Sequence, residues 1–309
     1  MKAVRYHSYG DTGVLVHEDT DLPAAGPGQV VVKVAATSFN PVDVAIRAGY
    51  VREVFPLTFP HIPNFDLSGV ITAIGDGVEG WSEGDAVVAF LPMTTPGAAA
   101  EYTVVPAGIL AAAPRSVDLA DAAALPAVGL TAWQALYEHA ALRAGRHILI
   151  NGAGGAVGGY ATQLAKRTGA VVTATAGPRS AGRIRSYAAD QIVNHTETPV
   201  TRALEGRRFD VVLNLVRTSP EETAELTNLV ADDGVFVSTT TAAEDTGRGV
   251  RVAQVFARSD AAQLAELVAR VDAGTLKIDV AGRRPLADLA AVHEEAVTGR
   301  LAGKTILIP

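Results

Sequence analysis

The chain contains no cysteine among its 309 residues. Disulfide bonds, thiolate nucleophiles and zinc sites that need sulfur ligands are therefore excluded. The seven histidines are scattered along the sequence, and no two have the spacing by which a helix binds zinc. The sequence predicts no metal site.

Net positive charge and long apolar runs are also lacking. The formal net charge of −7 at pH 7 would repel nucleic-acid phosphates and anionic lipid headgroups. No apolar stretch approaches the roughly 18 to 20 residues that a membrane-spanning helix needs. The first residues lack the apolar core of a signal peptide. We therefore expect a cytoplasmic protein with neither a nucleic-acid nor a membrane partner.

The length and the hydrophobic pattern predict two domains. The first third of the chain has short β-branched segments at 29–35, 67–74 and 86–90, separated by Gly/Pro-rich turns. This pattern is typical of a compact, barrel-like β domain. After residue 119 strands and helices alternate, which is typical of a parallel doubly wound sheet. The predicted divisions are 1–118, 119–257 and 258–309, with the last segment returning to the first domain.

The individual elements of the second half follow from the same periodicities. We expect a long helical stretch over 119–144 and a last strand of the parallel sheet over 249–256. The other expected strands are 147–151, 171–176, 210–215, 235–239, 277–280 and 304–308, and the other helices are 156–168, 181–188, 220–230, 261–273 and 286–298.

The strongest local motif is the glycine-rich segment Asn151–Gly158 (NGAGGAVG), which lies between a predicted strand and a predicted helix. Small residues there would let the backbone approach a pyrophosphate, and the helix N-terminus offers unpaired N–H groups. The spacing differs from the strict G-x-G-x-x-G, because Val157 stands at the third glycine. A merely flexible turn is the alternative, but the flanking elements favour a nucleotide site that includes Gly152.

The strand that follows indicates which nucleotide binds. An NAD site usually has an acidic residue there for the ribose 2′-hydroxyl, whereas 171–176 ends without one. Thr175, Ala176 and Gly177 leave room, and Arg179 and Arg183 follow. Guanidinium groups bind phosphate well, so the sequence favours NADPH. The alternative is that both arginines are ordinary surface residues.

A second segment, Asn40–Gly49, has a purely structural explanation. Asn40 and Pro41 are typical of the N-cap and first residue of a helix. Asp43 and Arg47 are four residues apart and are expected to pair on one face. Gly49 would then end the helix.

Taken together, several segments resemble the medium-chain dehydrogenase/reductase superfamily, in its zinc-free, zeta-crystallin-like quinone oxidoreductase branch. Asn40–Gly49 resembles the branch motif N-P-x-D-x-x-x-R-x-G, and Pro60–Val70 resembles P-x-I-P-G-x-D-x-x-G-V, with Asn64 in place of glycine. Further matches are Gly84–Val87, Ala100–Tyr102, Gly129–Leu136, the glycine-rich turn and Gly303–Lys304. The resemblance implies an α/β protein with a GroES-like β-barrel catalytic domain, a Rossmann domain and a substrate cleft at their junction.

The resemblance also implies site residues. The positions of the Cys and His that hold zinc in the alcohol dehydrogenases fall in Asn40–Pro41 and Asn64–Asp66, which lack those ligands. The resemblance assigns Asn40 and Thr131 to the nicotinamide, Gly154, Gly155, Ala156 and Val157 to the pyrophosphate, Arg179 to the 2′-phosphate, and Val255 and Phe256 to the carboxamide. Three residues depart from the branch: Tyr50 comes one position early for its tyrosine, His195 replaces a tyrosine near the cofactor phosphates, and Asn214 replaces an aspartate.

We therefore expect an NADPH-dependent reductase of small quinones, with Tyr50 and Asn40 as candidate proton or hydrogen-bond donors. An enone, 2-alkenal or enoyl reductase of the same superfamily is one alternative, and a non-catalytic NADPH-binding structural or regulatory protein is another. The sequence leaves open whether one or two electrons are transferred at a time. Strand 249–256 would lie at a sheet edge that needs covering, and family members commonly pair there, so we expect a homodimer.

Overall fold

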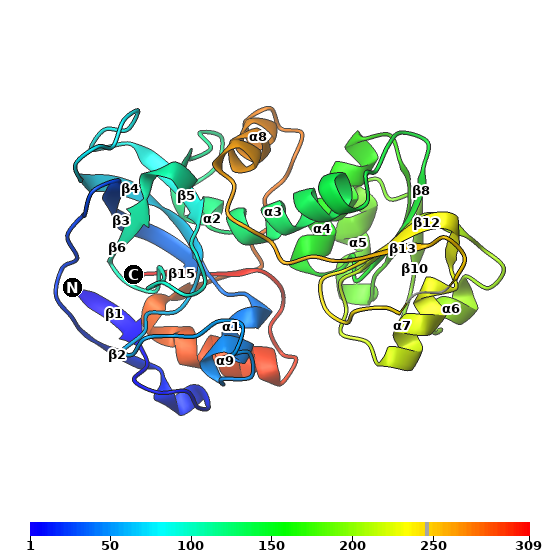
Figure 1. Cartoon of the computed structure of the whole chain (residues 1–309), viewed down its shortest axis with the longest axis horizontal. Coiled ribbons are helices and arrows are strands. Elements are labelled where there is room, and N and C mark those ends of the chain that lie inside the picture. Colours follow the sequence, from blue (N-terminus) through cyan, green and yellow to red (C-terminus); the bar gives the residue numbers. More distant parts are fainter. Residues whose placement is uncertain (245–246) are drawn as a thin grey trace. The chain divides into compact units, whose positions relative to one another are not determined.

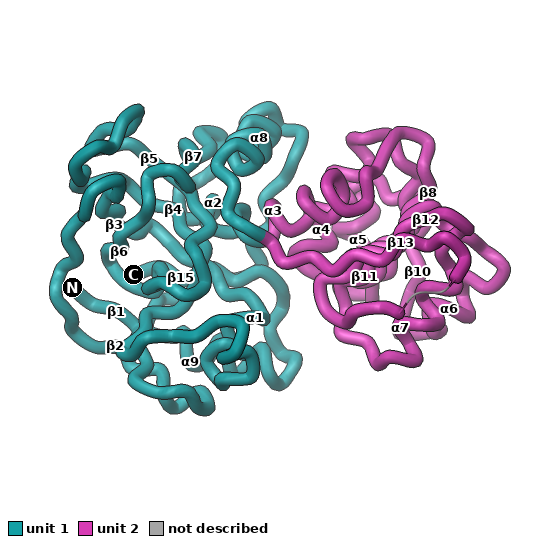
Figure 2. The backbone as a smooth tube through the Cα atoms, viewed as in Figure 1, with its two compact units in different colours: residues 1–127, 258–309 teal, residues 128–257 magenta. Residues whose placement is uncertain are grey.

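The computed structural model describes residues 1–244 and 247–309, which form two compact units (Figures 1 and 2). Unit 1 contains residues 1–127 and 258–309, and unit 2 contains 128–257. Both ends of the chain thus build unit 1 (Figure 2). The first division lies after residue 127 instead of 118, because α2 (Leu119–Ala122) packs on strands β3, β4 and β15 of unit 1.

The stretch expected to be helical over 119–144 is helical only as far as His139, and it is interrupted between Ala122 and Pro126. Pro126 begins a second helix, α3 (Pro126–Trp133), which continues into a π-helical segment at Gln134–His139. Proline lacks an N–H and fixes its own φ, so it fits the first turn of a new helix better than the interior of a longer one.

Unit 1 is built mainly of strands. A pair of short antiparallel strands, β1 (Lys2–Arg5) and β2 (Val16–Asp19), stands beside a seven-stranded sheet. The strands of that sheet are β3 (Gln29–Ser38), β4 (Asp66–Ile74), β5 (Ala86–Phe90), β6 (Tyr102–Pro106), β7 (Ala111–Ala112), β14 (Gly282–Pro285) and β15 (Thr305–Ile308). Three helices complete the unit in addition to α2: α1 (Pro41–Arg47), α8 (Ala261–Asp272) and α9 (Leu289–Val297).

Strand β3 organises this unit. Along one side it pairs with β4, and along the other it pairs first with β6 and then, at Thr37 and Ser38, with β15. The end of the chain therefore lies beside the start of α1, where the candidate residue Asn40 is located. Helices α1 and α9 also contact each other there (Figure 1).

One predicted strand of unit 1 is wrong. Residues 277–280 form a loop, and β14 begins only at Gly282. The alternation of Ile278 and Val280 resembles a strand, but both side chains pack on a small cluster that includes Ala36 and Ile306. Their partial burial against this cluster, and not a ladder of backbone hydrogen bonds, explains the pattern.

Unit 2 has a six-stranded, all-parallel sheet in the order β10-β9-β8-β11-β12-β13. This order confirms the doubly wound sheet. Its strands are β8 (His147–Asn151), β9 (Val171–Thr175), β10 (Gln191–Val193), β11 (Phe209–Asn214), β12 (Val230–Ser238) and β13 (Arg251–Gln254). The helices that follow α3 are α4 (Ala156–Arg167), α5 (Pro178–Ser186), α6 (Val200–Ala203) and α7 (Pro220–Thr227).

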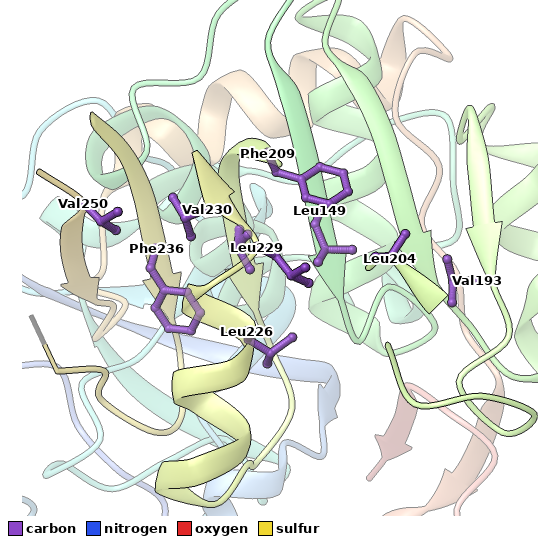
Figure 3. Packing of buried hydrophobic residues seen from close by; sticks show 10 residues of the cluster. Leu149, Val193, Leu204, Phe209, Leu226, Leu229, Val230, Phe236 and Val250 are labelled. Atoms are coloured by element: carbon purple, nitrogen blue, oxygen red, sulfur yellow. The ribbon is translucent and has the colours of Figure 1, made fainter. Parts of the chain in front are cut away.

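Apolar side chains on one face of the sheet pack against helix α7. Leu149 of β8 and Phe236 of β12 are fully buried there, in one cluster with Leu226 of α7 (Figure 3). Val212 of β11 belongs to the same cluster and is also fully buried. Burying such side chains stabilises the fold by roughly 1.5 to 3 kcal/mol each. This packing holds β8 and β11 in place, and the glycine-rich turn begins at the carboxyl end of β8.

Strand β13 pairs only with β12 among the described strands and is shorter than the predicted 249–256. Its outer edge is the surface through which we expect a second copy to bind, and the homodimer stays a prediction. In the part of the chain that the structure describes, no helix has the length and apolar character needed to cross a membrane.

Candidate functional site

The glycine-rich turn of unit 2 depends on two glycines. Gly152 has a φ of +91°, and a Cβ there would lie 2.7 Å from Cγ2 of Val216. A Cβ on Gly158 would lie 2.3 Å from the carbonyl oxygen of Gly152 and 2.5 Å from Cα of Ala153. Gly158 therefore provides the close approach of helix to strand that a dinucleotide-binding turn requires. This explains why Val157 is tolerated at the third glycine of the strict motif.

A chain of hydrogen bonds holds the turn against the sheet. The Thr175 hydroxyl accepts from the Gly152 N–H at 2.8 Å and donates to Oδ1 of Asn151 at 3.0 Å. The Asn151 amide in turn donates to Oδ1 of Asn214 at 2.9 Å. Asn214 also donates to the Val216 carbonyl at 3.1 Å, which an aspartate at this position could not do when ionised. Thr175 is buried, so its described contacts give it a role in shaping the turn.

Helix α4 begins directly after the turn. Gly155 is its N-cap residue and provides no side-chain hydrogen bond. The first N–H groups of a helix have no intrahelical partner, so those of Ala156 and Val157 can face a bound anion. The helix dipole adds partial positive charge at the same place. The turn, which includes Gly154, therefore fits a dinucleotide pyrophosphate.

The arginines expected to bind phosphate lie on α5, at the end of β9. Arg183 is half-buried, and its Nη2 donates to the carbonyl oxygen of Gly154 at 2.5 Å. Arg179 is exposed and makes no hydrogen bond or ion pair with the described residues. A Cβ on Gly177 would lie 3.5 Å from Nε2 of the exposed His195, so this histidine also lies at the end of β9.

The remaining predicted residues of unit 2 are spread over other elements. Thr131 is half-buried in α3. Val255 is buried directly after β13, and its N–H donates to the Ser238 carbonyl at 2.8 Å. The neighbouring Phe256 is 68% exposed, which leaves its ring available to a ligand.

In unit 1 the side chain of Asn40 takes part in a buried polar centre. Its Oδ1 accepts from the Lys304 ammonium at 2.7 Å, and its Nδ2 donates to Oδ2 of Asp66 at 2.8 Å. Lys304 and Asp66 also form an ion pair at 3.0 Å, and their side chains are 4% and 0% exposed. Burial on this scale requires that the charges be paired and hydrogen-bonded.

Asp66 accepts four hydrogen bonds in this centre. Oδ2 receives those from Ser38, Asn40 and Lys304, and Oδ1 receives the backbone N–H of Ala127 at 2.6 Å. The sequence motifs contain Lys304 and Asp66 but assign no role to either residue. The sequence signal that could have identified them is a charged residue at the start of an apolar strand, Asp66 at β4 and Lys304 directly before β15.

The expected pairing of Asp43 with Arg47 is wrong. Both are buried, but Asp43 accepts the Asn40 N–H at 2.7 Å, and Nε and Nη1 of Arg47 have no hydrogen-bond partner among the described residues. Asp43 lies in the first turn of α1, where its carboxylate forms part of a capping box with the N-cap residue Asn40. Burial raises the pKa of Asp43 to about 7.

Tyr50 lies just beyond α1. Its side chain is 82% exposed and has no hydrogen bond with the described residues. Its role as a proton donor therefore stays a prediction. No three His, Asp or Glu side chains gather as a potential metal site within 1–244 and 247–309.

Known proteins resemble the chain over its whole length. A family model described as an alcohol dehydrogenase GroES-like domain matches residues 26–115, and one described as a zinc-binding dehydrogenase matches 187–307. The chloroplast envelope quinone oxidoreductase homolog of Arabidopsis thaliana is 33% identical over 100% of this chain and 98% of its own. The chain belongs to the quinone oxidoreductase branch of the medium-chain dehydrogenase/reductase superfamily.

Other members of the superfamily agree in fold. The human quinone oxidoreductase is 30% identical, with 100% of this chain and 98% of that protein covered. The quinone oxidoreductase structure from Coxiella burnetii covers 100% of this chain and 99% of its own, at 27% identity and a TM-score of 0.90. An NAD-dependent alcohol dehydrogenase structure covers 100% of both chains at 30% identity, with a TM-score of 0.88.

Membership of this branch makes the protein an oxidoreductase with a pyridine-nucleotide-binding domain and a small-molecule substrate. The backbone conformation explains why asparagine can replace the glycine of the branch motif at position 64. Asn64 has a φ of +66°, a region that asparagine tolerates better than other non-glycine residues, and its amide donates to the Ser38 carbonyl at 2.9 Å.

Proposed function

We propose that this branch member reduces small quinones with NADPH and needs no metal ion. The observation that carries the metal-free part of the proposal is the position of the Lys304 ammonium, between Asn40 and the Asp66 carboxylate. A metal cation at this place would be repelled by the Lys304 ammonium. The oxygen that could bind the cation, Oδ2 of Asp66, already pairs with Lys304 and accepts a hydrogen bond from Asn40. The relatives named as quinone oxidoreductases support the acceptor class.

The overall reaction is balanced as NADPH, a proton and a quinone giving NADP⁺ and a hydroquinone. When bound, the nicotinamide supplies the hydride. The protein has to hold the two planar molecules together and stabilise negative charge on the acceptor oxygen. The Asn40 amide is the candidate donor for that oxygen, and the turn at Gly154–Val157 would hold the pyrophosphate.

The first test is a substrate screen. Purified protein, extensively dialysed against a chelator, should oxidise NADPH with a benzoquinone or naphthoquinone and should be slower with enones and 2-alkenals. Activity that disappears on chelation and returns with zinc would contradict the metal-free proposal. Faster turnover of enones would point to an enone reductase, and no turnover of any acceptor would leave a non-catalytic NADPH-binding protein.

NADPH is the proposed cofactor because β9 ends without a carboxylate and α5 brings Arg179 and Arg183 to that end. We expect Arg179→Ala to raise the KM for NADPH about tenfold, since a charge-assisted hydrogen bond is worth about 1.5 kcal/mol at an exposed site. The KM for NADH should not change. Arg183→Ala should weaken the binding of both cofactors, because Arg183 donates a hydrogen bond to the Gly154 carbonyl in the phosphate-binding turn.

Arg185→Ala is the matched control, since Arg185 is an exposed arginine of the same helix. Steady-state kinetics with both cofactors for the three variants and the wild type distinguish these effects. Equal use of NADH and NADPH by the wild type would show that the NADPH proposal is wrong.

A further inference from the structure

The two neighbours of the Asn40 amide fix its orientation. An ammonium can only donate hydrogen bonds and a carboxylate can only accept them. Lys304 therefore requires the oxygen of the Asn40 amide on its side, at 2.7 Å, and Asp66 requires the nitrogen on the other side, at 2.8 Å. Exchanging the amide oxygen and nitrogen would break both hydrogen bonds, so only one of the two possible orientations is compatible with this centre.

One N–H of Asn40 remains available in this orientation. A side-chain amide has two N–H donors, and Asp66 takes one of them. The other has no acceptor among residues 1–244 and 247–309. Asn40 is 7% exposed, unlike the Asp66 side chain, which is fully buried. The direction of this second donor is therefore already set by Lys304 and Asp66.

We infer that Lys304 and Asp66 are positioning residues, which hold the Asn40 amide so that its second N–H donates to the acceptor oxygen as negative charge develops there. This inference rests on the proposed function. A donor that is fixed before reaction stabilises charge without having to reorient. The buried ion pair provides that rigidity, and its two charges largely cancel, so it adds little net field of its own.

Two variants at Lys304 distinguish an effect of the donor's direction on kcat from an effect of the lysine's charge. Lys304→Gln and Lys304→Met both remove the charge and leave Asp66 without its ion pair, but only glutamine can still donate to Oδ1 of Asn40. We expect Lys304→Met to lower kcat for quinone reduction about ten- to a hundredfold, with little change in the KM for NADPH. Lys304→Gln should recover most of kcat.

A double-mutant cycle tests whether Lys304 acts through Asn40. In an Asn40→Ala background, Lys304→Met should lower kcat no further than Asn40→Ala alone. Equal kcat values for Lys304→Met and Lys304→Gln, or additive losses in the cycle, would overturn the inference in favour of a purely structural ion pair.

A spectroscopic measurement keeps the inference testable if Lys304→Met does not fold. The side-chain Nδ2 protons of Asn40 are assigned by the signals lost in Asn40→Ala, and the one bonded to the Asp66 carboxylate should lie well downfield of the ordinary side-chain amide range in the wild-type NMR spectrum. With NADP⁺ and a phenolate product analogue bound, one of them should shift strongly and the proton bonded to Asp66 should not. Shifts of both protons, or of neither, would refute the fixed donor. If the wild type reduced no quinone yet the downfield proton bonded to Asp66 was present, the proposed function would fail while the positioning by Lys304 and Asp66 would stand.

Discussion

Gly158→Ala should reduce NADPH affinity about a hundredfold and lower the free energy of unfolding by about 3 kcal/mol. The added Cβ would lie 2.3 Å from the Gly152 oxygen and 2.5 Å from Cα of Ala153, so backbone atoms would have to move. Overpacking of this kind costs about 1 to 3 kcal/mol, and more where the backbone must shift. Because the displaced atoms belong to the phosphate-binding turn, we expect the loss to appear in cofactor binding as well.

Gly159→Ala, one residue further along α4, is the matched control. Its Cβ would meet only Cε2 of Tyr187, at an ordinary 3.5 Å. Alanine in a helix interior is about 0.5 to 1 kcal/mol more favourable than glycine, so this variant should bind NADPH normally and melt at the same or a higher temperature. Fluorescence titration with NADPH and thermal unfolding compare the two variants. Similar behaviour of both would show that the close packing at Gly158 is unimportant.

Lys304→Met should lower the free energy of unfolding of unit 1 by about 3 to 5 kcal/mol. It would leave the fully buried Asp66 carboxylate without its ionic partner, and an uncompensated buried charge typically costs that much. Three donors to Asp66 would remain, from Ser38, Asn40 and Ala127, which limits the loss. Urea unfolding followed by the signals of each unit measures the effect.

The comparison for this prediction is the ion pair between Lys166 and Asp190 in unit 2, at 2.7 Å with side chains 24% and 42% exposed. Exposed pairs contribute about 0 to 1 kcal/mol, so Lys166→Met should lower the free energy of unfolding by no more than about 1 kcal/mol. A loss below about 1 kcal/mol in Lys304→Met would contradict the cost expected for leaving the buried Asp66 carboxylate without its ionic partner.

The parallel sheet of unit 2 was the part of the fold most accessible from sequence. Strand β8 was predicted at its observed bounds because a short apolar run before a glycine turn has few alternatives. The helical stretch over 119–144 is interrupted before Pro126, and the strand at 277–280 was wrong because loop residues can also bury alternate side chains. Local pattern does not distinguish these cases without the neighbouring elements.

The candidate site was predictable only where it is local in sequence. The turn from Gly152 to Gly158 is one continuous segment, and its chemistry follows from its residues. The ion pair between Asp66 and Lys304 joins positions 238 residues apart, and the spacing of Asp43 and Arg47 suggested a different partner for Asp43 from the one observed. Which buried charges meet is decided by the pairing of β3 with β15, and no local pattern encodes that pairing.

That strand pairing also sets an order of events during synthesis. Residues 128–257 of unit 2 leave the ribosome as one continuous segment, whereas β3 of unit 1 obtains its β15 neighbour only from residues 305–308. Domains generally fold as units as they emerge, so the nucleotide-binding unit has its complete sequence while the other unit still has an open flank on β3. Until residues 304–308 arrive, Asp66 has no lysine to pair with, so the candidate catalytic centre is assembled only after unit 2 has its complete sequence.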